Sequence, residues 1–151
     1  MAKKRIHRIS VYLLDLHRRR VLLRRSPNGP FANQYLAMSA PWNENFTPVE
    51  IAKTLILRTT NLDFIFLTYG PSMPMLLDER SIKTYPPFHM QVTLVDPDTE
   101  YIDYVYLAQA KVAPEFPHDG ELGWFNQTNL RAAPSFVKHM VHHILNVVIP
   151  N

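Results

Sequence analysis

The four residues Thr47-Pro48-Val49-Glu50 are the strongest local signal in this 151-residue chain, and they predict where its central helix begins. A Thr side chain can cap the first free amides of a helix, a proline loses nothing at the first helical position, and Glu50 can bond back to the Thr47 amide. Apolar residues then recur at helical spacing as far as Asn61, which can adopt the left-handed conformation that closes a helix. We therefore expect a helix from Pro48 to about residue 60.

Runs of apolar and aromatic residues on both sides of this helix predict strands, and an amphipathic pattern over residues 134–148 predicts a second helix. We expect antiparallel hairpins from the first and second runs and from the fifth and sixth runs. The order of elements implies an α/β fold, with helices on both faces of a mixed β-sheet, in a single domain of residues 1–151. The expected strands are residues 9–14, 21–25, 35–39, 63–69, 88–95, 101–112 and 121–125.

Cysteine and glycine usage excludes several chemistries. The chain has no cysteine, which excludes disulfides, thiolate zinc sites and cysteine nucleophiles. Its 4 glycines are scattered, so neither a P-loop nor a G-x-G-x-x-G motif is present. The apolar stretch behind the basic start is too short for an export signal, and no window reaches the roughly 20 apolar residues of a membrane helix. We expect a cytoplasmic protein without a membrane partner.

Positive charge is concentrated near the start of the chain, where residues 3–25 carry 9 of the 16 Lys and Arg residues and one acidic residue. Such an edge could meet a polyanion, but basic residues also gather at solvated hairpin turns. No nucleic-acid motif accompanies the charge, so a nucleic-acid partner is not expected.

Seven pieces of sequence, taken in order, resemble one known family. They are His7-Arg8, residues 11–15, residues 21–26, residues 35–40, the Thr47-Pro48 helix, residues 101–107 and residues 121–125. Their order and spacing resemble the Nudix superfamily, particularly its branch near isopentenyl-diphosphate isomerase, in which a His-Arg pair opens the first strand. The resemblance covers most of the chain. It implies a Nudix-like α/β/α sandwich, and it implies an enzyme of diphosphate substrates that uses magnesium ions held by glutamates.

The family signature, G-x5-E-x7-R-E-U-x-E-E-x-G-U with U a bulky aliphatic residue, is degenerate in this chain. When its closing Gly-U is placed on Asn61-Leu62, the two aliphatic positions match, but the glutamate positions do not. No Asp or Glu occurs between Ile51 and Leu62, so a shift of register does not restore them. The chemistry-bearing positions hold Ala40 for the first Gly, Phe46 for the loop Glu, Thr54-Leu55 for Arg-Glu, and Arg58-Thr59 for Glu-Glu.

These replacements predict that the magnesium site is absent, because Mg²⁺ requires oxygen ligands and a guanidinium repels it. We therefore expect no metal and no cofactor. The metal site of the isomerase branch is not expected either, because the chain lacks its cysteine and has Pro41 where that branch often has His; of that set, His7 remains. Residues three and four apart share a helix face, so Leu55, Arg58 and Thr59 are predicted to face one cleft, approached by Phe46.

An anion site without metal is the chemistry that remains. The resemblance places Arg25 toward a substrate diphosphate, and Arg58 could supply the countercharge in place of a metal. Tyr35 and Phe46 could stack on a base or ring. The alternatives are an exposed strand end for the arginines and core packing for the aromatic residues. Asp103 is expected to be a surface or hairpin residue.

Three functions follow from these residues, and whether the chain is an enzyme stays open. The first is a Nudix-fold protein that binds a nucleotide or other phosphorylated small molecule without hydrolysing it. The second is a hydrolase of a nucleoside diphosphate derivative that uses magnesium and carboxylates outside the signature: Asp78, Glu79, Glu115, Asp119 or Glu121. The third is a non-catalytic scaffold for protein partners. A homodimer is compatible with each of them.

Overall fold

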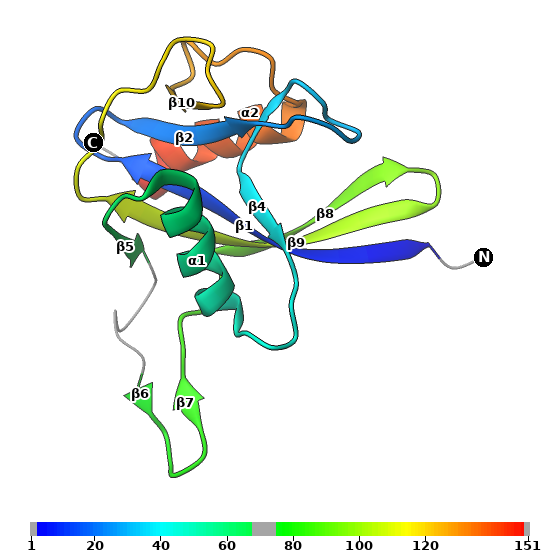
Figure 1. Ribbon diagram of the computed structural model, residues 1–151, viewed down its shortest axis with the longest axis vertical. Coiled ribbons are helices and arrows are strands. Elements are labelled where there is room, and N and C mark those ends of the chain that lie inside the picture. Colours follow the sequence, from blue (N-terminus) through cyan, green and yellow to red (C-terminus); the bar gives the residue numbers. More distant parts are fainter. Residues whose placement is uncertain (1–2, 68–74, 150–151) are drawn as a thin grey trace.

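The computed structural model describes residues 3–67 and 75–149. Within them, eight strands form one mixed sheet around β1 (Lys4–Asp15) and β9 (Thr99–Ala110), which pair in parallel at its centre (Figure 1). All other pairs in this sheet are antiparallel. The remaining strands of the sheet are β2 (Arg20–Arg25), β3 (Tyr35–Leu36), β4 (Met38–Pro41), β5 (Phe64–Leu67), β8 (His89–Asp96) and β10 (Leu122–Phe125).

The predicted central helix is α1 (Pro48–Thr60), and its two ends are confirmed. Thr47 Oγ1 accepts from the Glu50 amide at 3.2 Å, and the Glu50 carboxylate accepts from the Thr47 amide at 2.9 Å. Hydrogen bonding to the carboxylate by Thr47, chiefly by its backbone amide, holds the pKa of Glu50 below its ordinary value. Asn61 closes the helix in the left-handed conformation, with φ of 55°.

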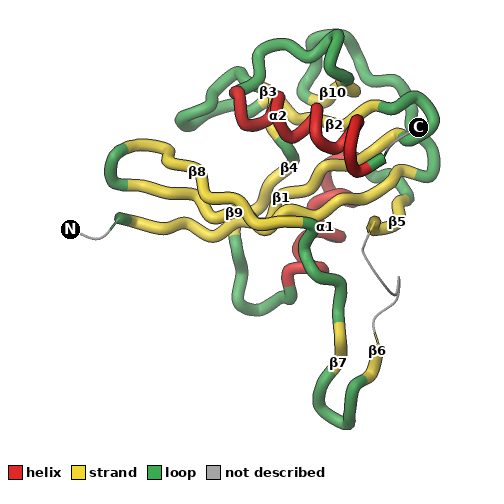
Figure 2. The backbone as a smooth tube through the Cα atoms, turned by 180° about the vertical axis from the view of Figure 1, so that it is seen from behind, coloured by secondary structure: helices red, strands yellow, loops and turns green. Residues whose placement is uncertain are grey.

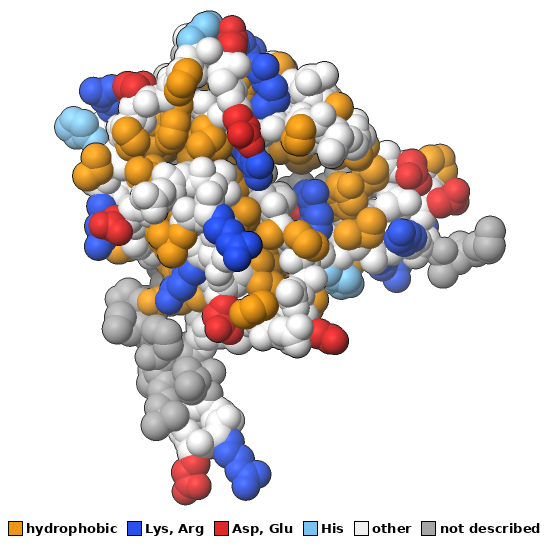
Figure 3. All heavy atoms as spheres, in the orientation of Figure 1, with side chains coloured by type: hydrophobic (Ala, Val, Ile, Leu, Met, Phe, Trp, Pro, Cys, Tyr) orange, Lys and Arg blue, Asp and Glu red, His pale blue; other side chains and the backbone are white. Residues whose placement is uncertain are grey.

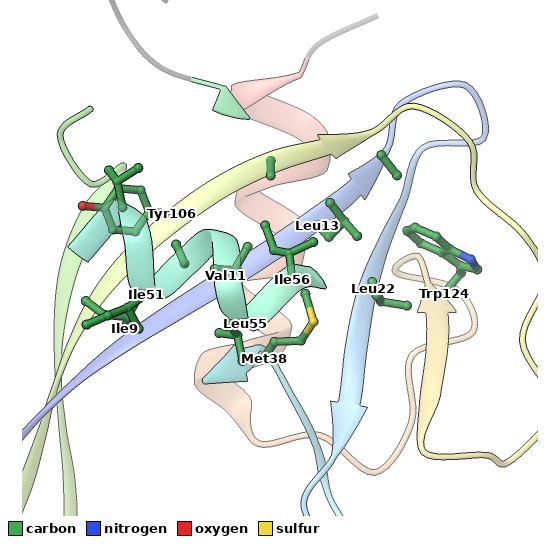
Figure 4. Packing of buried hydrophobic residues seen from close by; sticks show 14 residues of the cluster. Ile9, Val11, Leu13, Leu22, Met38, Ile51, Leu55, Ile56, Tyr106 and Trp124 are labelled. Carbon is green, nitrogen blue, oxygen red and sulfur yellow. The ribbon is translucent and has the colours of Figure 1, made fainter. Parts of the chain in front are cut away.

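The two helices cover opposite faces of the sheet, as predicted (Figures 1 and 2). Alternate residues of β1 point to opposite faces, so Val11 packs with α1 while Leu14 packs with the terminal helix α2 (Ser135–His143). Figure 4 shows the α1 side, where Ile56 and Leu55 lie among the side chains of β1 and β4. Each face of the sheet therefore has its own apolar core.

Several boundaries differ from the expectation. Residues 35–39 form two short strands, because β3 pairs with β2 while β4 pairs with β1. The terminal helix changes at its end into a π-helical turn, η1 (Ile144–Val148). The connection expected over residues 70–87 lies partly outside the described residues; its described part contains a small hairpin, β6 (Met75–Leu76) and β7 (Ile82–Lys83), which projects from the body (Figure 1). Residues 68 and 69 of the expected fourth strand also lie outside the described residues.

Within the described residues, neither helix has the length and the apolar character that a membrane span requires.

Candidate functional site

Three arginines line one open hollow beside β3 and β4. Arg8 comes from β1, Arg24 and Arg25 come from the end of β2, and Ser26 and Ser39 complete the polar part of the lining. Figure 3 shows the surface hollowed between the loop that follows β2 and the β8–β9 hairpin, with Lys or Arg side chains beside the hollow. We call this feature the arginine hollow. Its lining includes cationic residues that are as much as 17 positions apart in the chain, from Arg8 to Arg25.

Arg25 is held in place by Tyr35, one of the predicted site residues. Arg25 Nη2 donates to Tyr35 Oη at 2.9 Å, and the guanidinium lies 4.9 Å from the centre of the Tyr35 ring. The Tyr35 hydroxyl in turn donates to the Gly120 carbonyl at 2.8 Å. Arg25 Nε is buried and has no hydrogen-bond partner among the described residues, which is costly for a charged group. The structure therefore places two of the sequence-predicted site residues, Arg25 and Tyr35, in direct contact.

The Tyr35 ring itself has no open face for a ligand. Only 1% of Tyr35 is exposed, and its ring packs at 4.7 Å from the ring of Phe125. The expectation that Tyr35 stacks on a base is wrong, because the side chain is part of the core on the α2 face. Its contribution to the hollow is to orient Arg25.

A buried carboxylate, Asp103, lies next to the hollow; it belongs to the β8–β9 hairpin, as expected, but it is not at the surface. Asp103 is 4% exposed, and its Oδ1 accepts from Arg8 Nε at 3.0 Å and from Ser10 Oγ at 2.9 Å. Ser10 and Ser39 are hydrogen-bonded to each other at 2.9 Å. Burial, with the charge of Asp103 as a second cause, raises the pKa of the neighbouring Tyr12. A carboxylate at this depth needs a partner, and Arg8 provides it.

Sequence reasoning missed this cluster because its members are joined by the parallel register of β1 and β9, which sets Arg8 beside Asp103. The one available signal was an acidic residue within an otherwise apolar and aromatic strand, Tyr101-Ile102-Asp103-Tyr104-Val105.

Comparison with solved structures decides which fold this is. A hydrolase of the NUDIX family from Clostridium perfringens superimposes over 94% of this chain and 97% of its own, with a TM-score of 0.67 and 18% identity. The chain has the Nudix fold. A UDP-X diphosphatase matches with a TM-score of 0.62 and 8% identity, over 95% of this chain and 64% of its own. A MutT NUDIX hydrolase from Burkholderia pseudomallei matches with a TM-score of 0.56 and 13% identity, over 94% of this chain and 99% of its own. No protein-family model and no curated protein matches the sequence.

The positions aligned with the Nudix signature do not share one face of α1. Leu55 is 8% exposed and packs in the α1-side core, whereas Arg58 is exposed. The expected cleft-facing group of Leu55, Arg58 and Thr59 is therefore wrong for Leu55, which the sheet holds on the inner side of the helix. Phe46, 53% exposed, lies on the loop before α1.

The four predicted binding residues lie on two opposite faces of the sheet, two residues on each face. Arg25 contacts Tyr35, which belongs to the core on the α2 face. Arg58 and Phe46 belong to α1 and its preceding loop, on the opposite face, and neither lines the arginine hollow. The structure therefore does not bring Arg58 to Arg25.

The carboxylates considered outside the signature are spread over the surface. Glu115 pairs with Arg18 at 2.7 Å, Glu121 with Arg24 at 2.6 Å, and Asp119 with Arg131 at 2.7 Å. The hydrogen bond from Arg131 is the main reason that the pKa of Asp119 is lowered. Asp78 and Glu79 lie in the turn of the projecting hairpin. Over residues 3–67 and 75–149, no three His, Cys, Asp or Glu side chains gather as metal ligands would.

Proposed function

We propose that this protein binds a nucleotide or another phosphorylated small molecule in the arginine hollow, without a metal ion and without hydrolysing it. The observation that carries the proposal is that Arg8, Arg24 and Arg25 line one open hollow, with Arg25 oriented by Tyr35. Guanidinium groups bind phosphate oxygens through several parallel hydrogen bonds and carry a permanent charge.

The nitrogens available in the hollow support this choice. Arg8 bonds Asp103 through Nε alone, so its two terminal nitrogens have no partner within the described part of the chain. Arg25 lies 3.9 Å from Asp119, a distance beyond a hydrogen bond. Asp119 and the Glu121 partner of Arg24 are exposed, so both pairs are weakened by solvent, and a phosphate can compete for these arginines.

We base the proposed absence of hydrolysis on the residues of α1. Its only carboxylate, Glu50, caps the helix start, and the signature positions present Leu55, Arg58 and Thr59, none of which supplies a carboxylate to Mg²⁺. A helix with this composition supports the sheet but holds no magnesium at the positions where the Nudix signature has glutamates.

The test is a thermal-shift panel of nucleoside diphosphates, sugar phosphates and inorganic pyrophosphate in EDTA, together with a phosphate-release assay in Mg²⁺ or Mn²⁺. We expect phosphorylated compounds to raise the melting temperature without metal, and we expect no product above that of heat-killed protein. Release of phosphate that a chelator abolishes would replace this proposal with the hydrolase that uses carboxylates outside the signature. A panel without any shift would favour the protein-binding scaffold.

A further inference from the structure

A narrow slot adjoins the arginine hollow. Its polar lining includes Ser10, Ser39, Gln91, Thr93 and Asp103, and it has room for about one water molecule. Arg8 and Ser39 line both the slot and the hollow, so the two share one wall. A ligand in the wider hollow can therefore place one small group into the slot.

The carboxylate of Asp103 gives the slot a defined chemical preference. Both hydrogen bonds that it accepts, from Arg8 and from Ser10, go to Oδ1. Among the described residues no donor reaches Oδ2, and Oδ2 is not fully enclosed. An ionised carboxylate only accepts hydrogen bonds, so the group that fits beside Oδ2 is a donor.

Arg8 separates this carboxylate from the hollow and fixes the spacing between them. Its Nε bonds Asp103, and its guanidinium carbon lies 4.1 Å from the centre of the Tyr101 ring. The same guanidinium lines the hollow, where its terminal nitrogens are available to an anion. A negative group and a hydrogen-bond donor can thus be bound on the two sides of one arginine side chain.

We propose that the slot formed by Arg8, Ser10 and Asp103 binds one hydroxyl or amine group of a ligand whose phosphate lies in the arginine hollow. This inference rests on the proposed function and narrows its ligand class to phosphate esters of hydroxylated or aminated compounds, such as sugar phosphates. Inorganic polyphosphates and phosphate esters of plain alcohols lack this hydrogen-bond donor and leave Oδ2 unpaired. A site with a buried acceptor binds such ligands much more weakly.

The experiment compares two esters of the same carbon skeleton, glycerol 3-phosphate and propyl phosphate, by NMR titration of the wild-type protein in EDTA. We expect glycerol 3-phosphate to bind at least about tenfold more tightly, which corresponds to one hydrogen bond to a charged group. Inorganic pyrophosphate is titrated in parallel. Binding of both esters with equal affinity would overturn the slot inference and leave the phosphate site intact. If none of the three compounds binds, the slot inference is overturned, and the thermal-shift panel with nucleoside diphosphates decides the proposed function separately.

Asp103→Asn sharpens the test, because an amide oxygen can still accept from Arg8 and Ser10 while the amide nitrogen places a donor in the slot. The preference for glycerol 3-phosphate should fall to about onefold in this variant, and propyl phosphate should keep its wild-type affinity. Thr47→Ala is the control: Thr47 caps α1 and lines neither the slot nor the hollow, so this variant should preserve the tenfold preference. An unchanged preference in folded Asp103→Asn would overturn the inference. If that variant does not fold, the ratio of the wild-type affinities for glycerol 3-phosphate and propyl phosphate decides whether the slot inference holds.

Discussion

The two faces of the central sheet are built in different ways. On the α1 face, apolar side chains from β1, β2 and α1 form one core, and the helix start is satisfied by a reciprocal pair of hydrogen bonds between Thr47 and Glu50. At the rim of the α2 face, Arg25 has a buried nitrogen without a partner among the described residues, and Asp103 is buried beside Arg8. The first arrangement maximises stability, whereas the second tolerates a cost in stability at one place. Such a cost in stability is expected at a binding site whose polar groups are preorganised for a ligand.

The largest effect should come from the α1 face. Leu55→Ala removes a buried side chain from the core, and we expect the free energy of unfolding to fall by about 2–5 kcal/mol, measured by chemical denaturation. Folded Leu55→Ala protein should bind phosphorylated ligands as the wild type does. A loss below about 0.5 kcal/mol would show that Leu55 points to a cleft, as the Nudix signature alignment suggests.

Arg25→Leu should have its effect on binding instead. A ligand present at 100 times its dissociation constant adds about 2.7 kcal/mol to the stability of the wild type, and this gain should disappear in the variant. The unliganded protein should change by about 1 kcal/mol or less, because one hydrogen bond to Tyr35 is lost while an unpaired buried nitrogen is removed. The measurement is a pair of melting curves with and without ligand. A retained shift would remove Arg25 from the site and remove the contrast between the two faces.

Thr47→Ala tests the capped start of α1. Loss of the cap should lower stability by about 0.5–2 kcal/mol without changing ligand affinity. Chemical denaturation of the variant and the wild type measures this loss of stability. An unchanged denaturation midpoint would mean that the cap of α1 does not stabilise the protein.

The smallest effect is expected for Arg58→Leu, an exposed position on α1 that makes no ion pair with a described residue. Stability should stay within about 0.5 kcal/mol of the wild type, and ligand affinity should stay within about twofold. Titration of both proteins with the same nucleoside diphosphate checks this. A tenfold loss of affinity would restore the sequence-based expectation that Arg58 acts with Arg25 and would place the ligand across both faces.

Local signals predicted the elements of the fold well. The capping box, the left-handed Asn61 and the alternation of apolar residues are properties of neighbouring residues, so the helix and the strand pairs could be placed from sequence within a few positions. The Nudix fold followed from the order of these elements.

The site was predicted less well, because it depends on register between distant strands. The β1–β9 register makes Asp103 a buried partner of Arg8, and no local pattern contains that information. Similarly, helical spacing groups Leu55 with Arg58, but only the position of the sheet decides that Leu55 faces inward. Arg25 was singled out because the resemblance implies a position toward a substrate diphosphate, and it lines the arginine hollow.

The parallel pairing of β1 with β9 also has a consequence for how the protein reaches its fold. In this pairing Lys4 lies opposite Thr99 and Leu14 opposite Gln109, so each partner is 95 residues away, 99 minus 4 or 109 minus 14. Contacts this distant in sequence must overcome the entropy of closing a long loop before they contribute, which slows folding. During synthesis, β1 can pair with β2 and β4 early, but its other edge stays open until β9 has been made. The ion pair of Arg8 with Asp103 forms across that late-closing edge, so the charged part of the slot is assembled only when the centre of the sheet is complete.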